Sequence, residues 1–140
     1  MLRKGHWTLY VVNIRKKCID ILDSNPYGEA MGGTTWKMYH NAQIELPKAK
    51  KLPWSRLLVH RLSAALQQAR SISGLPKFSN WPVDLLANCP TMKAASNDCG
   101  FFVMKFMQLY EWRLGRLTAT VDPVSMHFLL SVSVFHIILC

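Results

Sequence analysis

The feature that most constrains the fold is a long apolar run that begins at a cysteine. Residues 96–104 read Ser-Asn-Asp-Cys-Gly-Phe-Phe-Val-Met, and the apolar character continues to about Leu114. Three polar residues in this run recur at helical spacing and form one stripe: Lys105, Gln108 and Glu111. The pattern predicts a central, mostly buried helix from Cys99 to about Leu114. A thiol at the start of a helix is activated by the helix dipole and the free N–H groups there.

Two strand-like runs lie near the start of the chain. Residues 7–13 and 18–22 consist mainly of residues that favour strands, and residues 23–26, Asp-Ser-Asn-Pro, form a strong turn signal. Together they predict an antiparallel hairpin that ends at the turn. Because antiparallel strands of similar length bring their outer ends together, we expect the side chains of His6 and Asp23 to meet.

The rest of the chain adds helical and strand-like segments. We expect a short helix over residues 35–41, a loop from there to Pro53, and a strand over residues 81–86, where Pro82 indicates either an edge strand or the first position of a strand. Residues 53–70 predict an amphipathic helix. Its apolar stripe consists of Trp54, Leu57, Leu58, Leu62, Ala65 and Leu66. With 140 residues, half of them apolar, the chain suits one α/β (α+β) domain.

The charge balance limits the class of partner. Seventeen Lys and Arg against eight Asp and Glu give a net charge of +9, which favours nucleic acid, an anionic membrane or an acidic protein surface. The aromatic residues fall on predicted core faces, Trp36, Trp54, Trp81 and Trp112 among them, which disfavours nucleic-acid binding. The apolar run 128–140 is shorter than the roughly 20 residues of a membrane-spanning helix. We expect no membrane span, and we expect a monomer.

The cysteines and histidines are scattered through the chain. Cys18, Cys89, Cys99 and Cys140 stand singly, without a secretory signal before them, which predicts an intracellular chain with reduced thiols. No ligand spacing indicates a metal, so we expect buried cysteines and surface histidines rather than a zinc site. Residues 48–51, Lys-Ala-Lys-Lys, indicate a solvated surface or a nuclear-import signal. Location in the nucleus or the cytoplasm is therefore expected.

Histidine, aspartate and cysteine follow one another in the order of a thiol protease. A histidine beside a cysteine can take the thiol proton, and a carboxylate can orient the imidazole and stabilise its charged form. Each residue alone has a simpler reading. A single cysteine before an apolar helix is more often a core residue, and an Asp-Ser pair at a strand end is usually part of a turn. The combination of His6, Asp23 and Cys99 in compatible local structures favours the catalytic reading.

Three segments resemble the ubiquitin-like-specific protease family, the SUMO (sentrin) proteases, and most closely their plant members. They are His6–Val12 (His-Trp-Thr-Leu-Tyr-Val-Val), Ile19–Ser24 (Ile-Asp-Ile-Leu-Asp-Ser), and Cys89-Pro90 followed by Asn97–Met104. The resemblance covers residues 5 to about 115. It assigns residues 1–122 to a partial catalytic domain and leaves residues 123–140 as an apolar tail of unknown role.

The resemblance implies a papain-like fold and a mechanism that needs no cofactor. His6 is expected as general base and acid, Asp23 as its orienting group and Cys99 as the nucleophile, with Asp20 a poorer candidate for the acid. Trp7 is expected to help form a narrow tunnel for a Gly-Gly tail. Gly100, which has no side chain, allows close approach of a substrate backbone. The implied reaction is hydrolysis after that tail in a SUMO-type modifier or its conjugates.

The chain also departs from the family pattern. Members usually carry a Gln before the cysteine that helps to stabilise the oxyanion, whereas residues 91–96 read Thr-Met-Lys-Ala-Ala-Ser. The candidate replacements are Lys93, Asn97 and the backbone N–H of Cys99. The family's domain starts well before its histidine, so the resemblance implies that the N-terminal part, with one wall of the cleft, is missing. The alternative reading is a catalytically impaired fragment, or a binding module for a ubiquitin-like protein.

Overall fold

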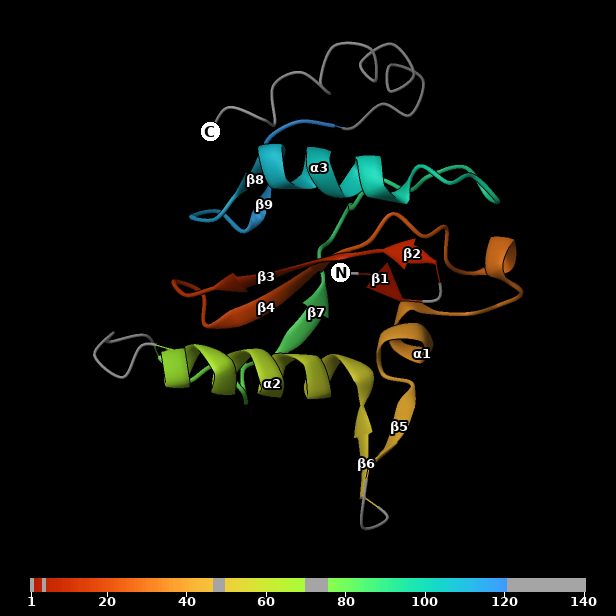
Figure 1. Ribbon diagram of the computed structural model, residues 1–140. Helices are drawn as coiled ribbons and strands as arrows, with labels where there is room; N and C mark the ends of the chain where they lie inside the picture. The colour runs from red at the N-terminus through yellow and green to blue at the C-terminus, as the bar shows by residue number, and fades with distance from the viewer. Residues whose placement is uncertain (1, 4, 47–49, 70–75, 121–140) are drawn as a thin grey trace.

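The computed structural model describes residues 2–3, 5–46, 50–69 and 76–120. Its centre is a three-stranded sheet (Figure 1). Strands β3 (Leu9–Asn13) and β4 (Cys18–Leu22) form an antiparallel hairpin, and β7 (Val83–Leu85) pairs with β4 in parallel. The central strand β4 therefore carries contacts from both neighbours, which suits its run of strand-favouring residues.

Two helices cover the two faces of this sheet (Figure 1). Helix α3 (Cys99–Leu109) packs one face through Phe101, Phe102 and Phe106, which surround Leu22. On the other face, α2 (Trp54–Ala69) contributes Val59 to a smaller cluster with Ile19 and Phe78. Side chains alternate between the faces of a strand, so Ile19 and Leu22 of β4 reach opposite layers. The fold is a mixed α+β arrangement with a core on each side of one sheet.

Smaller elements surround this centre. They are β1 (Leu2–Arg3), β2 (His6–Trp7), the 3-10 helix η1 (Glu29–Met31), α1 (Trp36–His40), β5 (Gln43–Leu46), β6 (Lys50–Pro53), β8 (Tyr110–Glu111) and β9 (Arg116–Leu117). The pairs β1–β2, β5–β6 and β8–β9 are each antiparallel.

The predicted N-terminal hairpin is confirmed, with one difference. The expected strand over residues 7–13 is interrupted at Thr8, so β2 and β3 are separate strands. Thr8 is buried, and its hydroxyl donates a hydrogen bond of 3.3 Å to Asp23. The interruption thus lets β2 pair with β1 while Thr8 faces the carboxylate.

The prediction of a loop between the short helix and Pro53 is wrong. The short helix is present as α1, with the Thr35 side chain accepting a hydrogen bond from the N–H of Met38. Beyond it, β5 and β6 form a hairpin in which Ile44 lies opposite Leu52. This cross-strand apolar pair stabilises two short strands that the surrounding lysines and prolines conceal in the sequence.

The expected helix from Cys99 to Leu114 ends five residues early. The backbone turns extended at Tyr110, and the chain continues into the β8–β9 hairpin. Asn13 holds this hairpin, because its side-chain amide donates to the Tyr110 hydroxyl and to the Trp112 carbonyl, each at 2.9 Å. The helix is also less buried than expected, since 66% of Met107 is exposed.

Helix α2 has the predicted extent but buries a different face. Its most buried side chains are Ser55, Val59 and Ser63, spaced four residues apart. In contrast, 41% of Leu62 is exposed, and Ala65 is exposed as well. Leu66 of the predicted stripe still packs against the cluster of Ile19, Val59 and Phe78, so the predicted face is only partly buried.

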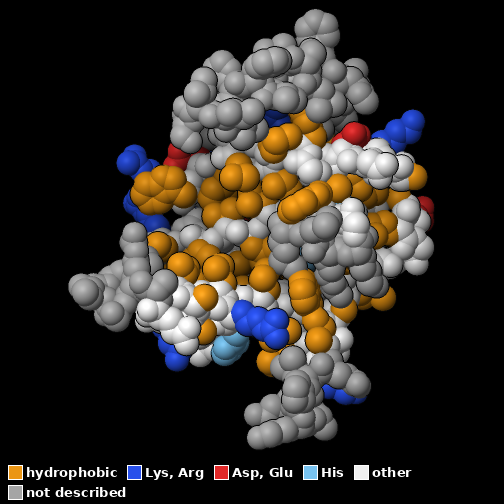
Figure 2. Space-filling model, in the orientation of Figure 1, with side chains coloured by type: hydrophobic (Ala, Val, Ile, Leu, Met, Phe, Trp, Pro, Cys, Tyr) orange, Lys and Arg blue, Asp and Glu red, His pale blue; other side chains and the backbone are white. Residues whose placement is uncertain are grey.

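Large apolar side chains are exposed on several elements (Figure 2). Among the described residues they are Trp7, Ile14, Met38, Leu62, Met104, Met107, Trp112 and Leu114. The expectation of a core position is wrong for Trp112, which is 52% exposed because it lies in the turn between β8 and β9.

Several sequence expectations fall outside the described part of the chain. The tail over residues 123–140 and residues 48 and 49 of the basic run 48–51 lie outside it. Among the described residues, no helix combines the length and apolar character needed to cross a bilayer.

Candidate active site

Asp23 directly follows β4 and is buried, with 2% of its surface exposed. Its Oδ1 atom lies 2.7 Å from the Nε2 atom of His6, which belongs to β2 and is also buried. The structure thus brings together the two side chains that the hairpin geometry places at neighbouring strand ends. A buried carboxylate bonded to an imidazole can fix which ring nitrogen carries the proton.

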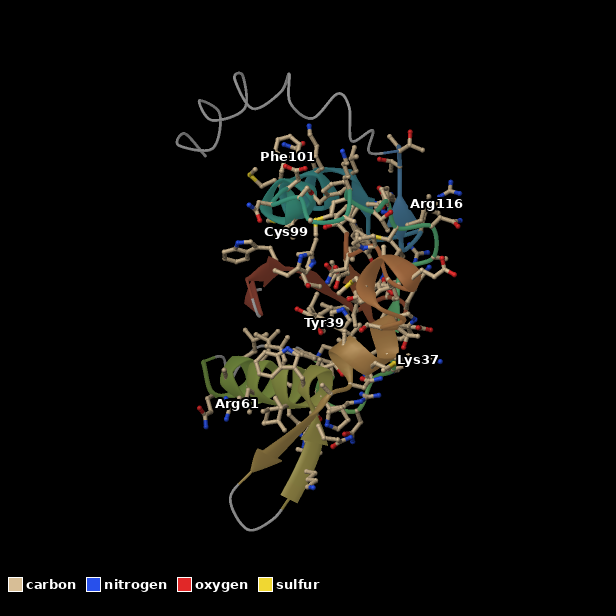
Figure 3. The ribbon with its side chains drawn as sticks, turned by 90° about the vertical axis from the view of Figure 1, so that its right-hand side faces the viewer. Lys37, Tyr39, Arg61, Cys99, Phe101 and Arg116 are labelled. Carbon is tan, nitrogen blue, oxygen red and sulfur yellow. The ribbon has the colours of Figure 1, made fainter. Side chains whose placement is uncertain are left out.

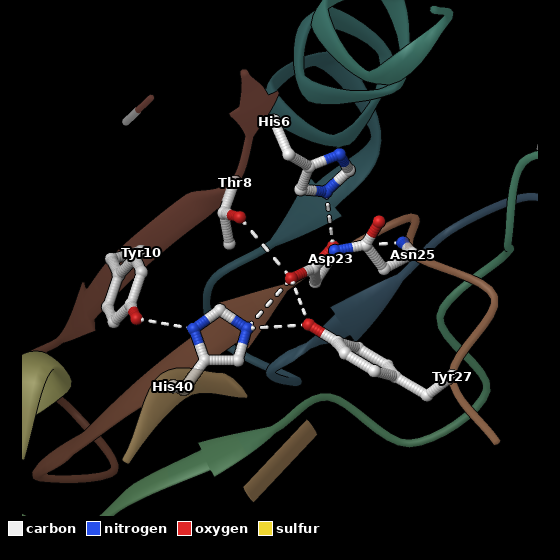
Figure 4. Close-up of polar contacts among 7 residues, drawn as sticks. All are labelled: His6, Thr8, Tyr10, Asp23, Asn25, Tyr27 and His40. Atoms are coloured by element: carbon white, nitrogen blue, oxygen red, sulfur yellow. Dashed lines mark hydrogen bonds and ion pairs between the residues drawn. The ribbon is translucent and has the colours of Figure 1, made fainter. Parts of the chain in front are cut away.

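The same carboxylate accepts hydrogen bonds from four further groups (Figure 4). Tyr27 donates its hydroxyl to Oδ2 at 2.6 Å, and His40 Nε2 lies 2.7 Å from that oxygen. Thr8 donates to Oδ2 at 3.3 Å, and the backbone N–H of Asn25 donates to Oδ1 at 2.9 Å. Asp23 is therefore held by residues before β3, after β4 and at the end of α1.

These contacts keep Asp23 ionised. Burial by itself raises the pKa of this carboxyl, but hydrogen bonds from His40, His6 and Tyr27 outweigh burial and hold the pKa well below its usual range. For Tyr27 the direction is the opposite. Burial and the negative charge of Asp23 raise the pKa of Tyr27 far above its usual value, so its hydroxyl remains a donor.

Cys99 is the first residue of α3 and is buried, with 5% exposed. In Figure 3 it lies on the side of α3 that faces the strands. Strand β2 packs against α3. A Cβ atom on Gly100 would stand 3.5 Å from Cδ1 of Trp7, so the residues that follow His6 and Cys99 are in contact. The two chain segments expected to carry base and nucleophile are therefore neighbours.

The candidate oxyanion groups lie in the segment before α3. The side chains of Lys93 and Asn97 are exposed there. Met92 takes a different position, because its side chain packs against the phenylalanine core of α3 and its N–H donates to the carbonyl of Ser24 at 2.8 Å. Met92 therefore anchors this segment, and the role of Lys93 and Asn97 stays a prediction.

Asp20, the poorer candidate for the acid, has other partners. Its Oδ2 atom accepts a hydrogen bond from the Tyr110 hydroxyl, and its Oδ1 atom accepts one of 3.4 Å from the Cys18 thiol. Burial and the negative charge of Asp20 raise the pKa of Cys18 to about 11. Asp20 therefore links β4 to the β8–β9 hairpin through its hydrogen bond with Tyr110.

Cys89 lies near the site, as the sequence indicates. It is partly buried and packs against the phenylalanine core of α3. Burial, together with the negative charge of Asp23, raises the pKa of its thiol to about 12. Cys89 is therefore a protonated packing residue at neutral pH rather than a second nucleophile.

The partners His40, Tyr27 and Thr8 of Asp23 were not predicted from the sequence. The expectation of a surface position is wrong for His40, of which 1% is exposed and whose Nε2 atom faces Asp23. The sequence places His40 at the end of a short helix but does not show where that helix lies. Long-range packing brings it to a carboxylate 17 residues earlier in the chain.

The described residues contain no group of three or more His, Cys, Asp or Glu side chains placed to hold a metal ion. The arrangement offers groups for acid–base and nucleophilic chemistry. A buried imidazole is oriented by an ionised carboxylate, and a cysteine begins the helix that packs against the strand of that imidazole.

Comparison with known proteins agrees with this chemistry. No curated protein and no solved structure matches the chain. Residues 1–113 match the model of the Ulp1 protease family, C-terminal catalytic domain. Members of that family are cysteine peptidases that act on ubiquitin-like modifiers and their conjugates. Because the match spans most of the 140 residues and includes His6, Asp23 and Cys99, the chain belongs to the Ulp1 protease family.

Proposed function

We propose that the chain hydrolyses the bond that follows the C-terminal Gly-Gly of a SUMO-type modifier, with Cys99 as nucleophile, His6 as base and Asp23 as its orienting group. The observation that supports this most is the buried hydrogen bond of 2.7 Å between His6 and Asp23. His6 belongs to strand β2, and β2 packs against helix α3, which begins at Cys99. A papain-like arrangement of helix and sheet is part of the proposal.

The hydrogen bond to Asp23 supports the following proton positions. Asp23 is ionised and accepts from Nε2 of His6, so Nδ1 is the nitrogen that takes the proton of the Cys99 thiol. The thiolate attacks the carbonyl carbon of the terminal glycine and forms a tetrahedral oxyanion. When the C–N bond breaks, His6 gives its proton to the leaving amine, and a thioester remains. Water then loses a proton to His6, attacks the thioester and releases the modifier and the thiol.

Trp7 and Gly100 supply the proposed specificity for glycine. The indole of Trp7 is 44% exposed and lies against the first turn of α3. Gly100 has no side chain there, which leaves space beside the indole for an extended substrate backbone. Residues with a Cβ atom would clash in a narrow passage, so a Gly-Gly tail fits best. The net charge of +9 suits an acidic modifier surface.

The test is covalent labelling of the purified chain by a SUMO protein that ends in a Gly-Gly electrophile. We expect an adduct on Cys99 that is lost in Cys99→Ser and His6→Ala. Cys89→Ser is the matched control, because Cys89 lies nearby but is held protonated. Labelling that persists in Cys99→Ser overturns the assignment of the nucleophile.

A binding module without turnover is the second candidate, and the segment before Cys99 favours it. Where family members carry the oxyanion Gln, this chain has Met92, which packs in the core, or Lys93, which is exposed. Loss of one oxyanion donor typically costs about 100- to 1000-fold in rate. A folded chain that binds the modifier, but neither reacts with the electrophile nor cleaves a conjugate, would establish this function instead.

A further inference from the structure

We propose that His40 is a positioning residue that shares the Asp23 carboxylate with His6 and so limits how strongly His6 holds a proton. The inference deepens the proposed function, since it rests on the role of His6 as catalytic base. It concerns a second imidazole on the orienting carboxylate, which a triad of cysteine, histidine and aspartate does not contain.

Both nitrogens of His40 have partners. The Nε2 atom lies 2.7 Å from Oδ2 of Asp23, and the Nδ1 atom lies 2.7 Å from the Tyr10 hydroxyl on β3 (Figure 4). Only 1% of His40 is exposed, so these contacts are shielded from water. A buried imidazole in two short hydrogen bonds has a fixed orientation.

The contacts assign a proton to Nε2. An ionised carboxylate only accepts hydrogen bonds, so Nε2 of His40 must donate to Asp23. The Tyr10 hydroxyl can donate to Nδ1 when the ring is neutral, or accept from it when the ring is charged. His40 can therefore exist in both protonation states without leaving a buried nitrogen unpaired.

The groups that face His40 come from several elements. Asp23 and Tyr27 follow β4, and Tyr10 belongs to β3. The ring of Tyr39 on α1 packs edge to face against the imidazole, with 5.1 Å between the ring centroids. His6 on β2 faces it across the shared carboxylate. Burial and the neighbouring negative charge keep the proton on Tyr27, so Asp23 is the anion in this group.

Sharing one carboxylate makes the two imidazoles competitors. His6 contacts Oδ1 and His40 contacts Oδ2, while Tyr27, Thr8 and Asn25 also donate to these oxygens. A carboxylate offers about four lone-pair sites, so these donors saturate it. Two positive rings that share one negative group repel each other, so a charge on His40 weakens proton binding at His6. Glutamine can keep the hydrogen bond to Asp23 but cannot carry this charge.

The experiment is an NMR titration of the imidazole groups in the full chain carrying Cys99→Ala, which removes the thiol as a competing titratable group. We expect His40→Gln to move the pH at which His6 gains its proton upward by about 1 pH unit. The matched control is His60→Gln, the same change at an exposed position of α2, which should leave the His6 curve in place. An unchanged or lowered His6 curve in folded His40→Gln overturns the proposal.

A second measurement decides the question if His40→Gln does not fold. With His40 present, competition predicts that the His6 and His40 curves each show an inflection where the other ring titrates. Two independent one-step curves overturn the proposal. Neither measurement needs catalysis or a modifier, so a chain that fails to cleave SUMO conjugates can still show the competition, and an active chain can still lack it.

Discussion

Nε2 of His6 and Oδ1 of Asp23 are joined by a hydrogen bond of 2.7 Å across the open end of the β3–β4 hairpin. Both side chains are buried, and the contact links residues 17 positions apart. The register of the hairpin explains the contact, because Leu9 lies opposite Leu22 and the residues beyond this pair must converge. Predictions for activity and stability follow from this arrangement.

Replacing Asp23 by Asn should abolish most of the reactivity of Cys99. The amide can present N–H groups to His6, which favours the wrong ring tautomer, and the equivalent change in other triads costs about 10⁴-fold in rate. The measurement is the rate of labelling by the Gly-Gly electrophile. Asp84→Asn, an exposed carboxylate on β7, is the control and should react as the unmodified chain does. Equal rates for the two variants would contradict the role of Asp23.

The same carboxylate should make the stability depend on pH in the acidic range. Its folded-state pKa lies below the unfolded value of about 3.9. The stabilisation is therefore fully present above about pH 5 and is lost progressively as the pH falls through the unfolded value toward the folded-state pKa. The free energy of unfolding, measured with urea from pH 6 to about pH 2, should fall less steeply for Asp23→Asn. Parallel curves would show that Asp23 is not the group responsible.

Gly100→Ala should separate stability from substrate access. The new Cβ atom meets Cδ1 of Trp7 at 3.5 Å, an ordinary contact, and alanine in a helix is favoured over glycine by about 0.5–1 kcal/mol. The melting temperature should therefore stay the same or rise. Labelling by the Gly-Gly electrophile should slow by about 10-fold or more, because the methyl group occupies the proposed passage for the tail.

A small reagent provides the control for this variant. Iodoacetamide does not need the passage, so it should alkylate Cys99 at the same rate in the Gly100→Ala chain and in the unmodified chain. If both reagents slow equally, the substitution has changed the thiol itself, and the proposed passage beside Trp7 is wrong.

Two neighbouring positions on α3 should differ sharply in their effect on stability. Phe106 is fully buried and packs against Phe102, with 5.8 Å between ring centroids, whereas Met107 is 66% exposed. Phe106→Ala should lower the free energy of unfolding by about 3–5 kcal/mol because it leaves a cavity. Met107→Ala should change it by about 0.5 kcal/mol or less. Denaturant unfolding of both variants measures this, and similar losses would contradict the packing of α3.

Local sequence patterns were sufficient for the main elements of this fold. The hairpin around β3 and β4, the helix α2 and the start of α3 at Cys99 each follow from periodicity or turn signals within a single segment. The approach of His6 and Asp23 follows from the hairpin, since antiparallel pairing alone defines which ends meet. These features depend on short-range chemistry, which one sequence expresses directly.

Only the tertiary structure decided which faces are buried and what surrounds Asp23. The stripe of leucines on α2 predicts one buried face, yet Ser55 and Ser63 lie inside because burial depends on the surface that the helix meets. His40 reaches Asp23 because α1 folds back toward the end of β4, and no local pattern encodes that return. A side chain's environment is the sum of contacts from distant segments, so a sequence read segment by segment predicts His6, Asp23 and Cys99 but not the second imidazole.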